Sequence, residues 1–189
     1  MIKALVGRRS ALVEARKGVR CRLKQSVEAK QITMDRDLEA VLTRQLKTIE
    51  QELSKLITKD QEMGNKVEKL RSIPGIGSVM SWMLLAHMPE LGKSGNKQIA
   101  ALAGAAPIAH NSGKSSGKRF VQLRRKTLRN VLYQAAMVAT QHNPDMKNFT
   151  ERLKKNGKPH KLVITAVARK LIVLVNKIIR QNRTWKLKI

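Results

Sequence analysis

The chain has 189 residues, of which 39 are basic and 13 are acidic, so its formal net charge is +26. A hydrophobic fraction of 42% is enough to build a buried core, which excludes a disordered basic tail. This charge favours a polyanionic partner: nucleic acid is the first expectation, and an anionic membrane surface is the weaker alternative. The single cysteine, Cys21, excludes an internal disulfide and is typical of a reducing compartment. No apolar run reaches the length of about 18 residues that a transmembrane helix needs, so we expect no membrane partner.

The first half of the chain predicts two long helices. Apolar residues recur there with heptad spacing: Leu5, Leu12 and Val19, and then, at steps of 4, 3, 4 and 3, Leu42, Leu46, Ile49, Leu53 and Leu56. The polar stretch 31–37 separates the two stripes and suggests a turn there, with Thr33 or Asp35 as the N-cap of the second helix. The helices either pack on the second half or form a coiled coil between chains. We favour the second alternative, a homo-oligomer through residues 1–62.

The second half predicts a series of shorter helices. They are expected after the turn at 73–77 up to about Met88, then over 96–103, 121–141, 144–155 and 160–181. Asn143 and Pro144 are expected as N-cap and first helical residue, Gly157 as a helix stop, and 104–117 as a loop. No segment alternates with period two, so we expect an all-α fold. It comprises a long helical hairpin or coiled coil (residues 1–64) and a compact multi-helix DNA-binding domain (residues 65–189) with a helix-hairpin-helix motif.

The charge is concentrated in the second half. Residues 1–72 hold 17 basic and 10 acidic residues, whereas residues 73–189 hold 22 basic and only 3 acidic ones. Three scattered carboxylates do not suffice for a two-metal nuclease site, and the four histidines lack the spacing of a zinc site. We therefore expect no metal and no cofactor within this chain.

Two features of this half are typical of binding to a phosphate backbone. In the predicted helix-hairpin-helix motif at 70–77, Gly75, Ile76 and Gly77 can bring backbone amides and a helix N-terminus close to a phosphate. An ordinary glycine-rich turn is the alternative. Basic residues then cluster at Lys114, Lys118, Arg119, Arg124, Arg125, Lys126 and Arg129. A charge run is usually only a solvated face, but no acidic residue lies between Glu90 and Asp145, which favours DNA binding.

The segment 110–117 carries a Ser-Gly step at Ser112. A serine hydroxyl becomes a nucleophile only when a base or nearby charge activates it; His110 and Lys114 are candidates. From spacing alone, a polar surface loop is the better interpretation. A Walker-type phosphate loop is excluded because the upstream glycine is missing.

Five ordered motifs together resemble the C-terminal transposase domain of the bacterial DEDD insertion-sequence transposases, relatives of the pilin-gene invertases. They lie at 73–77, 101–107, 112–113, 128–136, and 157–161 with 166–171. Residues 1–72 resemble that family's coiled-coil linker. The resemblance implies a recombinase in which an acidic, metal-binding domain works with a helical domain whose serine becomes covalently joined to DNA. That serine maps onto Ser112, with Ser115 and Ser116 as poorer matches.

The resemblance also implies DNA as partner, a structured guide RNA in some members, and a cytoplasmic, nucleoid-associated place in a bacterium. Divalent metal is expected only in the acidic domain, which we expect this chain to lack, so catalysis by the chain alone stays open. Our interpretation is the DNA-binding C-terminal part of an insertion-sequence transposase. The alternatives are an inactive transposase remnant that regulates by binding DNA, and a basic nucleoid-associated helical protein.

Overall fold

A computed structural model describes residues 1–105, 111–112, 115–116 and 126–187 of the chain. These residues form eight α-helices and one pair of two-residue strands, so the all-α expectation is confirmed. They divide into two compact units, Met1–Gly64 and Asn65–Ile189. Within the described ranges, no helix combines the length and the apolar character that crossing a bilayer requires.

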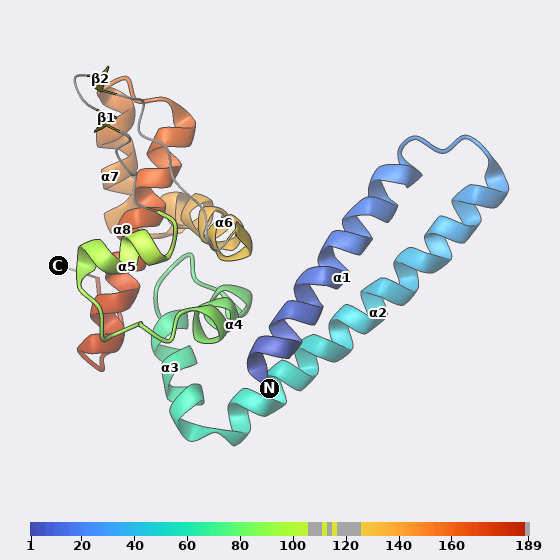
Figure 1. Cartoon of the computed structure of the whole chain (residues 1–189), viewed down its shortest axis with the longest axis horizontal. Coiled ribbons are helices and arrows are strands. Elements are labelled where there is room, and N and C mark those ends of the chain that lie inside the picture. The colour runs from blue at the N-terminus through green and yellow to red at the C-terminus, as the bar shows by residue number, and fades with distance from the viewer. Residues whose placement is uncertain (106–110, 113–114, 117–125, 188–189) are drawn as a thin grey trace. The chain divides into compact units, whose positions relative to one another are not determined.

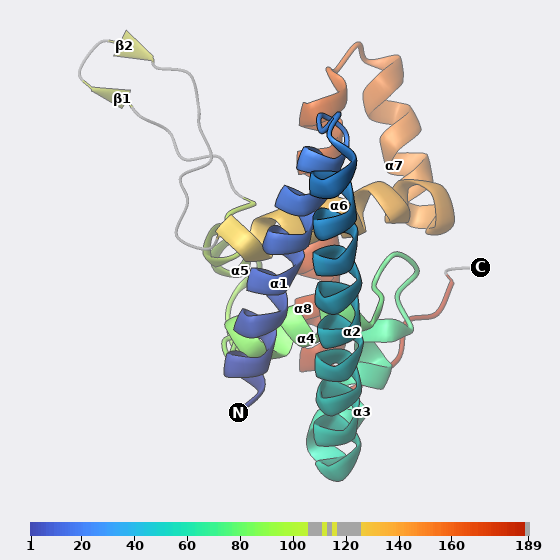
Figure 2. The ribbon, with the colours of Figure 1, turned by 90° about the vertical axis from the view of Figure 1, so that its right-hand side faces the viewer.

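The first unit is an antiparallel helical hairpin of α1 (Ile2–Leu23) and α2 (Ala29–Lys59), which lie side by side in Figures 1 and 2. The heptad stripes meet inside the chain: Leu12 and Val19 of α1 form one apolar cluster with Leu42 and Leu46 of α2. The seam of α2 therefore faces α1 of the same chain. Its burial removes from water the apolar surface that motivated a coiled coil between chains.

The predicted position of the hairpin turn was wrong. The turn lies at 24–28, Glu28 is the N-cap of α2, and the stretch 31–37 is already helical. Asp35, proposed as a cap, is buried and accepts hydrogen bonds from the Arg22 guanidinium, the shortest at 2.8 Å between Nη2 and Oδ1. These hydrogen bonds, and then the attraction of the carboxylate, raise the pKa of Arg22 above its ordinary value. A polar residue that looked like loop is thus half of an ion pair between helices.

Ion pairs also join the two helices along the rest of the hairpin. Arg9 of α1 contacts Glu50 of α2 at 2.8 Å, and Arg20 of α1 contacts Glu39 of α2. Several acidic residues of the first unit therefore neutralise neighbouring cations. The first unit has 14 basic and 9 acidic residues, so its excess of positive charge is small.

The second unit, Asn65–Ile189, is a bundle of short helices. It contains the C-terminal part of α3 (Gln61–Arg71), then α4 (Ser78–His87), α5 (Asn96–Leu102), α6 (Lys126–His142), α7 (Pro144–Lys155) and α8 (His160–Arg180). Helices α6, α7 and α8 pack on one another, α4 packs on α6, and α5 packs on α8. The core of the unit runs along α8, where Val167, Leu171, Val175 and Ile178 are buried. Their spacing of three and four residues places them on one helix face.

Helix ends in this unit follow the sequence signals. Asn143 is the N-cap of α7 and Pro144 its first residue, and Gly157 adopts a left-handed φ of +68° after the helix, all as predicted. The segment 104–117, which was expected to be a loop, contains a short strand pair. Strand β1 (Asn111–Ser112) runs antiparallel to β2 (Ser115–Ser116), with Ser112 opposite Ser115.

Candidate nucleic-acid interface

The segment predicted to be a helix-hairpin-helix motif forms a compact turn between α3 and α4. Ile73 and Ile76 are buried, and the Ile76 N–H donates to the Ile73 carbonyl at 3.0 Å. Gly75 has a left-handed φ of +101°, and a Cβ atom there would lie 2.6 Å from Cβ of Ala139 in α6. Glycine is therefore required here for close packing on α6. A contact between Gly75 and phosphate stays a prediction.

The far side of the same turn is open. Gly77 is the N-cap of α4, is exposed, and has no heavy atom within 4 Å of the place a Cβ would occupy. As a glycine, it has no side chain with which to cap the first amides of α4. The positive end of the α4 dipole thus has room for an anion, which is the geometry that a phosphate contact requires.

A buried amide fastens this turn to the rest of the unit. Asn143 donates from Nδ2 to the Pro74 carbonyl at 3.4 Å, and its Oδ1 accepts from the Met146 N–H in the first turn of α7. Asn143 is fully buried. One side chain therefore holds the turn at 73–77 in place and caps the start of α7.

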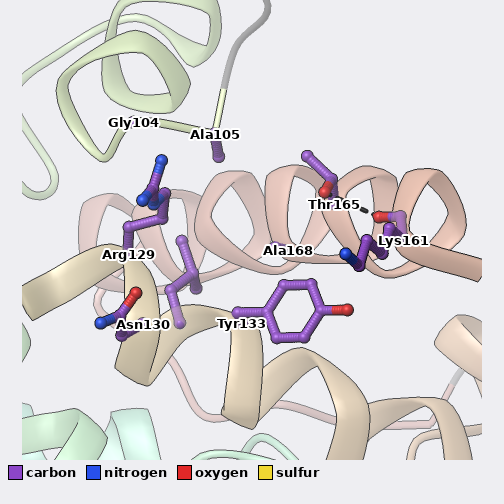
Figure 3. A pocket seen from close by; sticks show the side chains of 9 residues that line it. Gly104, Ala105, Arg129, Asn130, Tyr133, Lys161, Thr165 and Ala168 are labelled. Atoms are coloured by element: carbon purple, nitrogen blue, oxygen red, sulfur yellow. Dashed lines mark hydrogen bonds between the residues drawn. The ribbon is translucent and has the colours of Figure 1, made fainter. Parts of the chain in front are cut away.

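A pocket of about 520 Å³ lies between α6, α8 and the residues that follow α5. We call it the α6–α8 pocket; its walls are Gly104, Ala105, Arg129, Asn130, Leu132, Tyr133, Lys161, Thr165 and Ala168. Figure 3 shows Arg129 and Lys161 toward opposite ends of it, with the Tyr133 ring between them along α6. Arg129 and Tyr133 are one helical turn apart, as are Lys161 and Thr165, so each helix presents one face to the pocket.

The loop before α5 is held against α8 by a second buried amide. Asn176 of α8 accepts from the Gly92 N–H at 2.8 Å and donates to the Ser94 carbonyl at 2.9 Å. Arg180 also donates to the Ser94 carbonyl. These bonds position α5, and with it the Gly104–Ala105 wall of the pocket.

The structure describes only part of the predicted basic cluster. Lys126 is the exposed first residue of α6, and Arg129 is partly buried in the pocket wall. The other members lie outside the described residues: Lys114, Lys118, Arg119, Arg124 and Arg125. Ser112 lies in β1. Its predicted role as nucleophile is not tested by this backbone placement.

Sequence reasoning missed the cations of α7 and α8. Exposed basic side chains occur at Lys147, Arg152, Lys154, Lys155, Lys158, Lys161, Arg169 and Lys170. Lys170 of α8 and Arg152 of α7 both stack on the Phe149 ring, 4.5 and 5.3 Å from its centre. The scarcity of acids noted from the sequence applies to these helices too: the second unit has 25 basic residues and only 4 acidic ones, so most of its cations lack a carboxylate partner within the unit.

Residues 67–151 match the family model described as "Transposase IS116/IS110/IS902 family". We call them the transposase-family region; it spans the turn at 73–77, α4, α5, α6 and most of α7. Both the open N-terminus of α4 and the α6 wall of the pocket therefore lie inside it.

Curated relatives extend the likeness beyond the transposase-family region. The chain is 30% identical over 141 residues to the pilin gene-inverting protein of Moraxella bovis, and 32% identical over 142 residues to that of Moraxella lacunata. Each alignment covers 72% of this chain and 44% of the relative. A 42 kDa uncharacterized protein of insertion element IS900 from Mycobacterium paratuberculosis is 27% identical over 62% of the chain. The chain thus spans less than half the length of these relatives.

Proposed function

We propose that the chain is the DNA-binding C-terminal part of an insertion-sequence transposase or recombinase. The observation that carries this proposal is the match of residues 67–151 to a transposase family. The names of the curated relatives, two DNA-inverting proteins and one insertion-element protein, support the same chemistry. The charge of the second unit supports DNA as the partner, because a surface with this excess of lysine and arginine attracts a phosphate backbone.

In this proposal Ser112 supplies the nucleophile. Its Oγ attacks a backbone phosphorus while a base takes the hydroxyl proton; the new Oγ–P bond replaces the bond to one deoxyribose oxygen, which departs with a proton. One phosphoester replaces another, so the strand can be rejoined by the reverse reaction. Nearby cations of the basic cluster stabilise the charge that builds on the phosphate. Among the described residues no group of three His, Cys, Asp or Glu side chains is arranged to hold a metal ion.

We expect DNA binding to depend steeply on salt. If the second unit neutralises about six phosphates, the logarithm of affinity falls against the logarithm of salt concentration with a slope of about −5. Arg125→Glu with Arg129→Glu should weaken binding to all sequences alike and make that slope shallower by about two. Fluorescence anisotropy on a labelled duplex at several salt concentrations measures both.

A matched control for this experiment lies in the α1–α2 helical hairpin of the first unit. Lys47 is exposed on α2, outside the proposed interface, so Lys47→Glu applied with Lys3→Glu makes the same charge change there. These substitutions should leave affinity within about twofold. A flat salt response, or an equal loss from the control, would contradict DNA binding by the second unit.

We also propose that the hairpin carries self-association. Since the heptad seam is buried against α1, the exposed apolar residues of α2 are the available surface: Met34, Leu38 and Val41, at steps of four and three. Leu38→Asp with Val41→Asp should return an oligomer to monomeric mass in light scattering without unfolding the hairpin, because both side chains are over 40% exposed. Thr48→Asp, on an exposed polar position, should change nothing. A monomeric mass for the unaltered chain, with and without DNA, would refute self-association.

A further inference from the structure

We propose that the α6–α8 pocket binds one unpaired DNA nucleotide, with its base between the helices and its phosphates at the two cationic ends. This proposal rests on DNA being the partner of the second unit. It goes further by assigning a ligand class to a particular pocket.

The size of the pocket exceeds what a backbone phosphate needs. Its volume of about 520 Å³ falls in the range of about 300–1,000 Å³ that is usual for pockets holding small organic molecules. A contact to the backbone of intact duplex DNA needs only a surface of cations and amides. A concave pocket of this volume has room for a larger group.

The walls suit a flat heterocycle. Leu132, Ala168 and Ala105 are buried and supply an apolar floor, and Tyr133, only partly buried, supplies an aromatic ring. An unstacked base is typically held in this way, by an aromatic face and apolar neighbours that replace its lost stacking partners. The Asn130 amide can both donate and accept at the edge of a base.

Within the part of the chain that the structure describes, the polar groups of the walls have unused hydrogen-bonding capacity. No hydrogen bond within the described residues engages the side-chain amide of Asn130 or the hydroxyl of Tyr133. The Thr165 hydroxyl donates to the Lys161 carbonyl at 2.8 Å and keeps its capacity to accept (Figure 3). The pocket therefore offers donors and acceptors beside an apolar floor, a combination that an inorganic anion does not require.

The charges select a nucleotide over a neutral heterocycle. Arg129 contributes a guanidinium from α6 and Lys161 an ammonium from α8, toward opposite ends of the pocket. A nucleotide within a strand has a phosphate on each side of its sugar, so two separated cations match it.

The test compares a DNA duplex carrying one unpaired adenine with a fully paired duplex of the same length. The full chain should bind the first about tenfold more tightly, as expected when one base gains an aromatic stacking partner. Replacing the unpaired base by an abasic site should remove the preference. With 2-aminopurine at the unpaired position, its fluorescence should change on binding.

Variants of the pocket separate stacking from folding. Tyr133→Phe keeps the ring and should keep the preference, whereas Tyr133→Leu keeps only apolar bulk and should lose it. Asn130→Ala, at an exposed position, should also lower the preference. All three should bind the fully paired duplex within about twofold of the unaltered chain.

Two outcomes would overturn the pocket assignment: equal affinity for paired and unpaired DNA, or an undiminished preference in Tyr133→Leu and Asn130→Ala. Failure to bind even the fully paired duplex would instead refute the proposed function.

Discussion

Gly75→Ala should destabilise the second unit by about 3 kcal/mol and lower its melting temperature by about 10 °C. The new methyl would lie 2.6 Å from Cβ of Ala139 and 2.8 Å from its Cα, so either the turn at 73–77 or α6 must move. The φ of +101° adds strain, because alanine rarely adopts this region. Thermal unfolding followed by circular dichroism measures the change.

Gly77→Ala is the matched control in the same turn. Gly77 has a φ of −93° and no neighbour within 4 Å, so alanine should cost less than about 1 kcal/mol there. If the N-terminus of α4 approaches phosphate, however, the added methyl should lower DNA affinity several-fold for all sequences. Equal melting temperatures for the two variants would contradict the packing role of Gly75. Unchanged DNA affinity in Gly77→Ala would remove the turn from the interface.

Ser112→Ala should abolish the covalent adduct with DNA while changing DNA affinity by less than about twofold. One hydroxyl contributes little beside many phosphate contacts, whereas the Oγ–P bond cannot form without it. The chain is supplied with the acidic domain of a full-length relative, divalent metal and nicked DNA. The denaturation-resistant adduct is then quantified on a denaturing gel.

Ser115→Ala and Ser116→Ala are the controls and should retain the adduct. If one of them loses it while Ser112→Ala retains it, the nucleophile is assigned to the wrong serine and the mechanism stands. If the adduct forms without any of the three serines, covalent catalysis by this segment is wrong.

Helix positions could be predicted wherever the signal is local. Asn143 with Pro144 specifies a helix start through its own side chain and ring, and the apolar stripe of α8 specifies a buried face. The turn of the hairpin was misplaced because Asp35 is satisfied by Arg22, 13 residues earlier in the chain. No local pattern reports such an ion pair, so a polar stretch looked like loop.

The α6–α8 pocket could not be predicted for the same physical reason. Tyr133 and Lys161 are far apart in the sequence and meet only because α6 packs on α8. Arg129 was recognised because it belongs to a local run of cations. Gly75 was recognised as special from its motif, but its partner Ala139 is known only from packing.

The Asn143 amide joins the turn at 73–77 to the start of α7, so these two segments should move together. The turn cannot separate from the start of α7 without leaving the Asn143 amide donor and the Pro74 carbonyl unpaired, which costs about 1–3 kcal/mol for each buried group. Backbone amides of both segments should therefore exchange with deuterium at one common rate, as members of the same opening unit. A pull on DNA held at α4 would then be transmitted to α7 as a rigid displacement.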